Sequence, residues 1–285
     1  MIERAAVLGA GIMGVCTALF LARRGVSVTL YDQKPELLDG PSRWNEGKIH
    51  LGHLYGADRS LATAKRILPG GLAFLRLTEE LCGRPLDHLL TQGEDVYLSH
   101  RDSVIDVDGH RAVMAGVDAL VREHPDAGSY PGDPRDARHR PLSAAELAEI
   151  AQGDAVVAGV AVPERSMNTR RLSDLLVAAV EAEPRIEART GARVTAAAPE
   201  GPGADRWRIE TAGGGAEGGF DAVVNALWNG RLAVDRAVGI APPPRWSNRF
   251  RVAAFVRTSR PVATRSALVC VGPFGDVKNF GGREF

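Results

Sequence analysis

The sequence predicts an α/β fold in which a parallel-sheet domain is interleaved with a second, mixed-sheet α+β domain. Three observations support this fold class. Residues 5–32 contain a strand, a glycine-rich turn, a helix and a second strand in that order. Residues 186–228 contain further strand-like segments, and residues 94–150 combine a strand with amphipathic helices. Residues 5–32 and 186–228 are expected in one domain, and residues 94–150 in the other.

Composition limits the possible partners. The chain has 285 residues, of which 45% are hydrophobic and 25% charged, as in ordinary globular proteins of one large or two modest domains. The 35 basic residues balance 35 acidic ones, which argues against a nucleic-acid partner or an anionic membrane surface. We therefore expect a small-molecule partner. Arginine greatly outnumbers lysine, and Ala and Gly are abundant, which indicates a GC-rich bacterial genome.

The cysteine content predicts a reducing, cytoplasmic location. Cys16, Cys82 and Cys270 are too few and too scattered for a disulfide framework or a zinc cluster. Residues 5–22 carry no charge, but three glycines interrupt this run and no positively charged segment precedes it. The run is therefore expected to be neither a membrane span nor a signal peptide.

The first thirty residues predict a strand–helix–strand unit. Residues 5–8 form a short apolar run, which is typical of a buried parallel strand. Apolar residues then recur at helical spacing along one face, at Val15, Ala18, Leu19 and Ala22. Residues 26–30 alternate as a second strand, which ends at Tyr31 and Asp32.

The turn inside this unit has the spacing G-x-G-x-x-G. Gly9 permits the tight turn, Gly11 allows a pyrophosphate to approach the backbone, and Gly14 lets the helix pack closely on the strand. The helix N-terminus favours the phosphate charge. Asp32 can accept hydrogen bonds from ribose hydroxyls and disfavours the 2′-phosphate of NADP. The predicted dinucleotide site thus comprises Asp32 and the turn residues Gly9, Ala10, Gly11, Ile12, Met13 and Gly14.

Residues 7–14 resemble the corresponding segment of two enzyme families. One comprises the NAD-dependent 3-hydroxyacyl-CoA and 3-hydroxyisobutyrate dehydrogenases. The other comprises FAD-dependent oxidoreductases of the D-amino-acid oxidase type, which include glycine and sarcosine oxidases and 2-hydroxyglutarate dehydrogenase. Because both families share this first unit, later segments must separate them.

The polar segment over residues 41–52 resembles the flavin loop of the second family. The resemblance implies that Ser42 and Arg43 lie by the pyrophosphate. It implies that His50, the candidate catalytic residue, lies near the reacting centre, and that the isoalloxazine is bordered by Asn45, Glu46, Gly47, Lys48, Ile49 and His50. A structural role for His50 and a solvated charge at Lys48 are the alternatives. His50 and His53 lack a third ligand at a suitable spacing, so no metal site is expected.

Three downstream segments resemble the same family. Residues 163–172 open a helix at which the chain re-enters the cofactor domain. Residues 186–195 are expected to form one strand of the cofactor sheet, with the backbone of Val194 against the adenine. Residues 220–228 are expected to close the domain, with Asn225 and Ala226 near the FAD phosphates. The order of these segments favours FAD over NAD and implies a Rossmann-like, glutathione-reductase-like FAD-binding domain.

The expected domains are discontinuous. The FAD-binding domain is expected over residues 1–92 and 160–232, and the substrate domain over residues 93–159 and 233–285. Further expected elements are helices over 61–81, 109–123 and 142–150, the last capped by Ser143, strands over 94–99, 250–256 and 267–271, and a rigid connector at Pro242, Pro243 and Pro244.

The resemblance implies hydride transfer from a small amine, amino acid or 2-hydroxy acid to flavin N5. An arginine commonly binds the substrate carboxylate in such sites, and the candidates are Arg43, Arg249 and Arg251. The family pattern continues beyond a hairpin like that over residues 271–285, which implies a C-terminally truncated chain. The alternatives are an NAD-dependent 3-hydroxyacid or hydroxyacyl-CoA dehydrogenase and a truncated, non-catalytic dinucleotide-binding protein.

Overall fold

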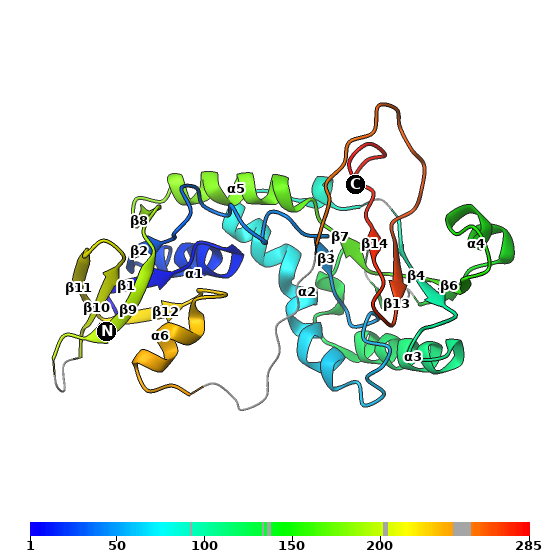
Figure 1. Ribbon diagram of the computed structural model, residues 1–285, viewed down its shortest axis with the longest axis horizontal. Coiled ribbons are helices and arrows are strands. Elements are labelled where there is room, and N and C mark those ends of the chain that lie inside the picture. The colour runs from blue at the N-terminus through cyan, green and yellow to red at the C-terminus, as the bar shows by residue number, and fades with distance from the viewer. Residues whose placement is uncertain (92, 133, 136–137, 202–204, 242–251) are drawn as a thin grey trace. The chain divides into compact units, whose positions relative to one another are not determined.

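The computed structural model describes residues 1–91, 93–132, 134–135, 138–201, 205–241 and 252–285. The chain forms two compact units, each built from two separate stretches of sequence. The first unit contains Met1–Asn45 and Thr169–Ala253, and the second contains Glu46–Asn168 and Ala254–Phe285. Figure 1 labels the helices and strands of both units.

A four-stranded parallel sheet forms the centre of the first unit. Its strand order is β12-β1-β2-β8. In the register of this sheet, Ala5 pairs with Val28 on one side and with Ala222 on the other. The predicted strands at the start of the chain are confirmed, and the four strands are β1 (Arg4–Leu8), β2 (Ser27–Tyr31), β8 (Ile186–Arg189) and β12 (Ala222–Asn225).

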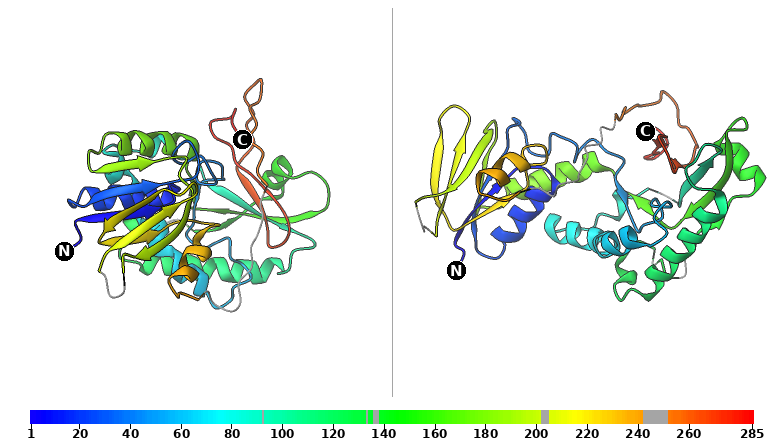
Figure 2. Two further views of the ribbon diagram at one scale, coloured as in Figure 1. Left: turned by 60° about the vertical axis from the view of Figure 1, so that its left-hand side comes forward. Right: turned by 60° about the horizontal axis from the view of Figure 1, so that its bottom comes forward.

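Different layers cover the two faces of this sheet. Helices α1 (Ile12–Ala22) and α5 (Thr169–Glu181) pack against each other, and Gly14 of α1 approaches the side chain of Val7. On the other face, Ala6 and Leu8 share a core with Phe220 of an antiparallel sheet. Figure 2 shows this second sheet beside the parallel one; it consists of β9 (Val194–Pro199), β10 (Trp207–Thr211) and β11 (Ala216–Phe220), and helix α6 (Arg231–Ala237) packs on it.

The prediction of a single strand over residues 186–195 is wrong. The chain turns after β8 at Gly191, which has a φ of +67° and donates its N–H to the carbonyl oxygen of Lys34 at 2.8 Å. Glycine tolerates this left-handed conformation, so the segment breaks there. The strand β8 stays in the parallel sheet, whereas β9 begins the antiparallel one.

A five-stranded mixed sheet forms the centre of the second unit, with the order β14-β13-β4-β6-β5. Its strands are β4 (Asp95–His100), β5 (Arg140–Pro141), β6 (Val156–Val162), β13 (Ala267–Cys270) and β14 (Asp276–Val277). A separate two-stranded pair joins β3 (Lys48–Ile49) to β7 (Arg165–Ser166). The helical segments are α2 (Ala62–Cys82), α3 (Val107–Glu123), α4 (Ala144–Ile150) and the two 3₁₀ turns η1 (Asp87–Leu89) and η2 (Ala127–Ser129).

The helices of this unit agree with the sequence. Ser143 caps α4 and exchanges hydrogen bonds with Glu146, as the predicted capping box requires. The expected strand over 250–256 is not present at residues 252–256. Its first two residues lie outside the described part of the chain, as do the expected connector and two candidate arginines: Phe250, Arg251, Pro242, Pro243, Pro244 and Arg249.

The compact units divide the chain at other positions than the expected domains. Residues 46–92 lie in the second unit, because α2 packs on α3 and on η2 rather than on the parallel sheet. The assignment of cofactor and substrate domains to particular residues stays a prediction.

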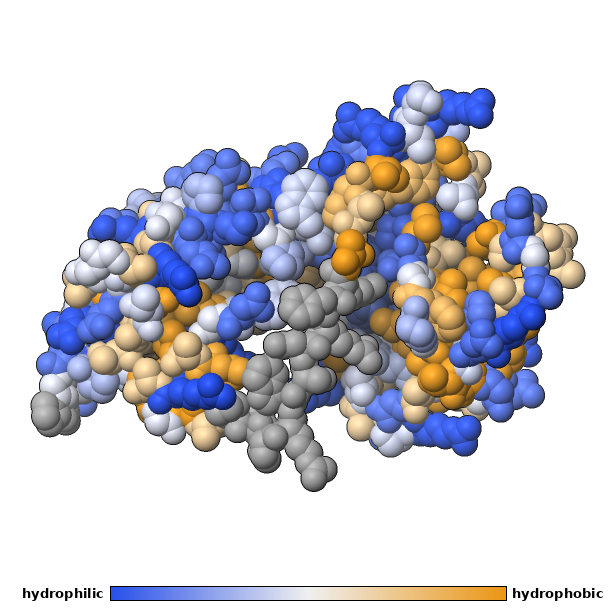
Figure 3. All heavy atoms as spheres, viewed as in Figure 1, coloured by the Kyte–Doolittle hydropathy of each residue, from blue (hydrophilic) through white to orange (hydrophobic). Residues whose placement is uncertain are grey.

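Within the described residues, no helix is long and apolar enough to cross a membrane. Figure 3 shows hydrophilic side chains along the outer face of α5. Arg171, Asp174 and Glu181 are exposed there, while Leu172 and Leu176 are buried on the opposite face. This helix is therefore amphipathic, with its apolar face packed within the first unit.

Candidate functional site

The turn between β1 and α1 requires glycine at two positions. Gly9 has a φ of +97°, and its N–H donates to the carbonyl oxygen of Tyr31 at 2.8 Å. A Cβ at Gly14 would lie 1.7 Å from the carbonyl oxygen of Gly9. Any side chain at Gly14 would thus separate the helix from the strand.

The last strand of the parallel sheet closes the other side of this turn. The Ala226 N–H donates to the carbonyl oxygen of Leu8 at 2.8 Å, and a Cβ at Gly9 would lie 2.7 Å from the Ala226 carbonyl oxygen. The structure thus brings Ala226 to the turn. The side chain of Asn225 instead donates to the Asp235 Oδ1 atom of α6 at 2.8 Å.

The N-terminus of α1 is open to an anion. Its N-cap residue is Gly11, which provides no side-chain cap. The Ile12 N–H donates to the Ser42 Oγ atom at 2.9 Å, so Ser42 lies at this end of the helix. Met13 is 70% exposed. A helix N-terminus favours a phosphate through its N–H groups and its partial positive charge.

Asp32 lies beside the same turn. Its Oδ2 atom accepts the Ala10 N–H at 2.6 Å, and its Oδ1 atom accepts the Lys34 N–H at 2.8 Å. Its backbone oxygen accepts the Ala192 N–H at 2.8 Å, which places the chain just before Val194 close to this carboxylate. Ribose hydroxyls are suitable donors to such a carboxylate.

Together these groups fit the ADP part of a dinucleotide. The absence of a Cβ at Gly11 leaves its backbone accessible, with Ser42 Oγ 3.3 Å from the Cβ position. The helix N-terminus matches the pyrophosphate and Asp32 matches the ribose.

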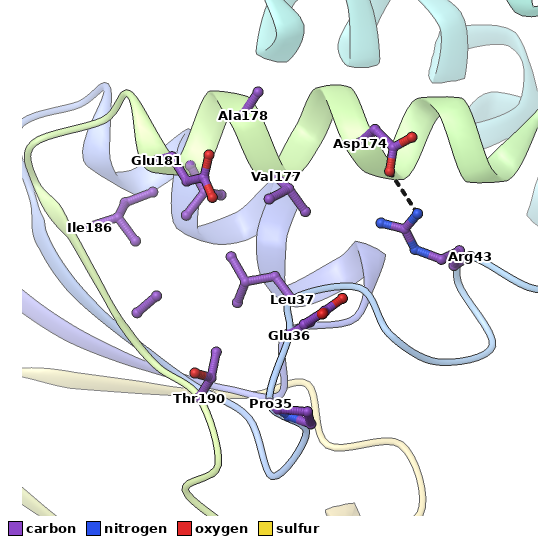
Figure 4. Close-up of a pocket in the computed structure, with 12 residues that line it drawn as sticks. Pro35, Glu36, Leu37, Arg43, Asp174, Val177, Ala178, Glu181, Ile186 and Thr190 are labelled. Atoms are coloured by element: carbon purple, nitrogen blue, oxygen red, sulfur yellow. Dashed lines mark hydrogen bonds and ion pairs between the residues drawn. The ribbon is translucent and has the colours of Figure 1, made fainter.

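A groove of about 660 Å³ lies elsewhere in the first unit, between α5 and the segment after β2. Figure 4 shows the Arg43 guanidinium pointing to Asp174 of α5, and their hydrogen bond measures 2.6 Å. The Asn45 side chain holds the same loop by donating to the carbonyl oxygens of Pro41 and Ser42. The groove is lined by Pro35, Glu36, Leu37, Arg43, Asp174, Val177, Ala178, Val180, Glu181, Ile186, Ala188 and Thr190.

The segment from Glu46 to His50 belongs to the second unit. The Gly47 carbonyl oxygen accepts the Met167 N–H at 2.8 Å. The Ile49 carbonyl oxygen accepts the Tyr130 hydroxyl at 2.9 Å. These bonds and the β3–β7 pairing fix the backbone that leads to His50.

Lys48 is buried, so a solvated charge at this position is wrong. Its side chain is 0% exposed, forms an ion pair with Asp95, and lies 3.7 Å from the Glu164 Oε2 atom. Burial acts to lower the pKa of Lys48, but the charges of Glu164 and Asp95 outweigh it and raise the pKa. The buried side chain of Lys48 therefore stays protonated.

A second lysine reaches the same carboxylate. The Lys278 Nζ atom donates to Asp95 Oδ2 at 2.7 Å. Burial and the neighbouring Lys48 charge lower the pKa of Lys278 to about 8.

His50 borders this cluster and is partly open to solvent. Its side chain is 24% exposed, and its Nδ1 atom lies 3.8 Å from Glu164 Oε2. Among the described residues, no group forms a hydrogen bond with this Nδ1 atom. The ring of Tyr55 lies beside it, with 5.9 Å between ring centroids.

His53 is fully buried between two carboxylates. Its Nε2 atom is 3.0 Å from Asp118 Oδ1, and its Nδ1 atom is 3.4 Å from Glu164 Oε1. Burial acts to lower the pKa of His53, but the bonds to Asp118 and Glu164 outweigh it and raise the pKa. No cluster of metal-ligating side chains occurs in the part of the chain that the structure describes.

The sequence interpretation missed the acids, the tyrosine and the second lysine that surround Lys48 and His53. Asp95 begins β4 and Glu164 follows β6, so each acid adjoins an apolar strand. A charged residue at the edge of a buried strand is unusual, and this pattern in the sequence indicates a buried ion pair. The missed residues are Asp95, Tyr97, Asp118, Glu164 and Lys278.

Comparison with known proteins identifies the family. Residues 4–265 match the family model of the FAD dependent oxidoreductases (DAO). No match was found among the curated proteins.

Solved structures share the fold. Glycine oxidase from Geobacillus kaustophilus has a TM-score of 0.65 at 17% identity, and the match covers 99% of this chain and 70% of that one. A mutant of NikD, an unusual amino acid oxidase, also has a TM-score of 0.65, at 18% identity, with 99% and 68% of the two chains covered. For L-proline dehydrogenase from P. horikoshii the TM-score is 0.61 at 14% identity, with 99% and 68% covered.

The family match establishes the cofactor. The NAD-dependent alternative is therefore wrong. The chain belongs to the FAD dependent oxidoreductases of the DAO family, and it is an enzyme whose cofactor is FAD.

Proposed function

We propose that this enzyme oxidises a small amine, amino acid or 2-hydroxy acid, with a hydride passing from the substrate to flavin N5. The observation that carries the proposal is the turn at Gly9 and Gly14, where any Cβ would meet backbone atoms within 3 Å. This turn brings the α1 N-terminus, Ser42 and Asp32 close together.

In this proposal, the residues at and around the turn contact different parts of FAD. The N–H groups at the start of α1 and the Ser42 hydroxyl bind the pyrophosphate. Asp32 accepts the ribose hydroxyls, and the backbone of Val194 borders the adenine. Bound FAD supplies the electron-accepting ring, and this chemistry belongs to the cofactor.

In the second unit we propose His50 as the catalytic residue. Its imidazole is partly exposed, so a small substrate can reach the ring, while its buried Nδ1 atom faces the Glu164 Oε2 atom at 3.8 Å. An imidazole of this kind can accept or donate a proton beside a reacting C–H bond. The remaining proposed contacts are Arg43 and Asn45 in the first unit and Glu46, Gly47, Lys48 and Ile49 in the second.

The amino-acid class is the substrate class that the structural neighbours support. These neighbours are a glycine oxidase, an unusual amino acid oxidase and an L-proline dehydrogenase. A small substrate also suits a chain with a net charge of zero, which offers no electrostatic preference for a nucleic acid or an anionic membrane. We further propose a cytoplasmic location, which the scattered cysteines support.

Anaerobic spectroscopy tests the substrate class. The protein is reconstituted with FAD, freed of excess cofactor, and mixed with glycine, sarcosine, L-proline, D-alanine, lactate or 2-hydroxyglutarate. We expect at least one amine to bleach the bound flavin. Bleaching by a hydroxy acid alone would instead assign the substrate to the 2-hydroxy acids. Retained FAD without bleaching by any of these compounds would support a non-catalytic dinucleotide-binding protein instead.

A variant separates catalysis from cofactor retention. His50→Gln keeps a polar side chain of similar size but cannot exchange a proton near neutral pH. We expect this variant to hold FAD as the wild type does and to bleach roughly a hundredfold more slowly. Equal bleaching rates would remove His50 from the reaction.

A further inference from the structure

Glu164 is a fully buried carboxylate that gathers three successive backbone N–H groups. Its Oε1 atom accepts the N–H groups of Leu51, Gly52 and His53 at 2.7, 3.0 and 3.3 Å. These residues follow His50 directly. The backbone after the proposed catalytic histidine is therefore folded around a single anionic oxygen.

Two glycines make this arrangement sterically specific. Gly52 has a φ of +128°, and a Cβ there would lie 2.7 Å from the Cβ of Ala64. A Cβ at Gly71 of α2 would lie 2.0 Å from the His50 carbonyl oxygen. The backbone at His50 is thus held between the Glu164 carboxylate on one side and α2 on the other.

The second oxygen of Glu164 faces side chains. The Tyr97 hydroxyl donates to Oε2, which lies 3.7 Å from Lys48 Nζ and 3.8 Å from His50 Nδ1. Behind the three N–H groups, His53 lies between Glu164 and Asp118, and the His139 Nδ1–H group donates to Asp118 Oδ2 at 2.6 Å. The facing titratable groups are therefore Lys48, His50, His53 and Tyr97, from elements on both sides of the carboxylate.

These contacts keep the carboxylate charged. Burial acts to raise the pKa of Glu164, but interactions with His50 and His53 and the charge of Lys48 hold the pKa well below its ordinary value. A buried carboxylate with this many donors is a fixed anion rather than a proton carrier.

We infer that Glu164 is the positioning residue for His50. It fixes the backbone of residues 51–53 and thereby sets where the His50 imidazole lies, without itself touching the substrate. The inference rests on the proposed function, in which His50 acts at the reacting centre.

Three variants test the inference. Glu164→Gln keeps an acceptor oxygen for the three N–H groups and loses the charge, whereas Glu164→Leu loses both. Asp118→Asn is the matched control, because it removes the carboxylate on the opposite side of His53 and leaves the three N–H bonds in place. Thermal unfolding establishes that each variant is folded.

The first measurement is hydrogen–deuterium exchange at the amides of residues 51–53, without FAD or substrate. We expect exchange to be at least about tenfold faster in Glu164→Leu, intermediate in Glu164→Gln, and within about twofold of the wild type in Asp118→Asn. Equal exchange in the two Glu164 variants and the control would overturn the inference.

The second measurement is steady-state turnover with whichever amine of the panel bleaches the flavin fastest. We expect kcat to fall roughly a hundredfold in Glu164→Leu, with KM changed less than about twofold. In Glu164→Gln we expect kcat to be about tenfold higher than in Glu164→Leu. A kcat in the Glu164 variants equal to that of Asp118→Asn would contradict a positioning role.

The outcomes for the inference and for the proposed function are distinguishable. If the wild type neither holds FAD nor turns over any compound, the proposed function fails, while amide exchange still decides whether Glu164 fixes the backbone. If Glu164→Leu does not fold, the comparison of Glu164→Gln with Asp118→Asn decides the inference by the same two measurements.

Discussion

At the scale of single residues, the glycines of the first turn divide into two kinds. Gly9 and Gly14 are required by the fold, because a Cβ at either position would meet backbone atoms at 2.7 Å or less. Gly11 differs, since the nearest atom to its Cβ position is the Ser42 Oγ atom at 3.3 Å, and a side-chain hydroxyl can shift. Packing therefore does not require glycine at this position, and we propose that the approach of the FAD pyrophosphate does.

This difference gives a test of cofactor binding at a single position. Gly11→Ala should fold, with a melting temperature close to that of the wild type, because only Ser42 must adjust. Its affinity for FAD should fall about tenfold, or ~1.4 kcal/mol, because the methyl group occupies the approach to the pyrophosphate. A titration of apoprotein with FAD, followed by flavin fluorescence, measures the affinity.

Gly40→Ala is the matched control, since a Cβ there meets no atom within 4 Å. It should bind FAD as the wild type does. An unchanged affinity in Gly11→Ala would place the pyrophosphate elsewhere.

Glu164 also predicts how stability depends on pH. Its pKa in the fold lies well below its ordinary value of 4.5, so the unfolded chain binds more protons at acidic pH. The stabilisation is present above pH 4.5 and is lost as the pH falls toward the lower pKa of the fold. The free energy of unfolding of the wild type should therefore decrease between about pH 5.5 and about pH 3.5.

Urea unfolding of Glu164→Gln over the same pH interval isolates this contribution. The variant lacks the titrating group, so its free energy of unfolding should fall less than that of the wild type. Asp118, whose pKa is also lowered, is present in both proteins. Parallel pH profiles would show that Glu164 is not held as a buried anion.

At the scale of elements, the antiparallel sheet of the first unit packs on the parallel sheet through a shared core that includes Phe220. Phe220 at the end of β11 is fully buried, and its ring meets Tyr31 of β2 edge to face at 6.4 Å between centroids. Arg4 of β1 covers the same ring at 4.3 Å. This residue therefore joins the two sheets across their shared core.

Phe220→Ala should lower the free energy of unfolding by about 3–5 kcal/mol, because it leaves a cavity between the sheets. Phe20→Ala on α1 is the matched control, since Phe20 is 42% exposed. It should cost below about 1 kcal/mol. Urea unfolding of both variants measures the difference, and similar losses would contradict the assignment of Phe220 to the core.

Elements with a local signal could be predicted from the sequence, whereas their long-range partners could not. The capping box at Ser143 and Glu146 correctly predicted the start of α4, because both residues lie within one helical turn. The break at Gly191 was missed, because a strand lies on each side of it and the two strands differ in the sheet that each one joins.

The candidate site divides in the same way. The glycine turn and Asp32 follow a spacing within one strand–helix–strand unit, so the sequence shows them directly. The burial of Lys48 depends on Asp95 and Glu164, which approach it only through folding of the second unit. No local pattern distinguishes such a lysine from a solvated one.

At the scale of the whole molecule, each compact unit joins two separate stretches of chain, and the two stretches of the first unit are more than a hundred residues apart. In the first unit, β1 pairs with β12 across this separation, and β2 pairs with β8. The glycine turn is complete only when Ala226 of the later stretch packs against Gly9. FAD binding should therefore stabilise the pairing of both stretches, since a ligand specific for the folded state favours it by mass action.

The melting temperature of the apoprotein with added dinucleotides tests most directly whether this assembled turn binds FAD. At a FAD concentration about one hundred times the dissociation constant, the fold should gain ~2.7 kcal/mol and melt at a visibly higher temperature. NAD at the same concentration should leave the melting temperature unchanged. An unchanged melting temperature with FAD, or a larger increase with NAD, would contradict FAD binding at this turn.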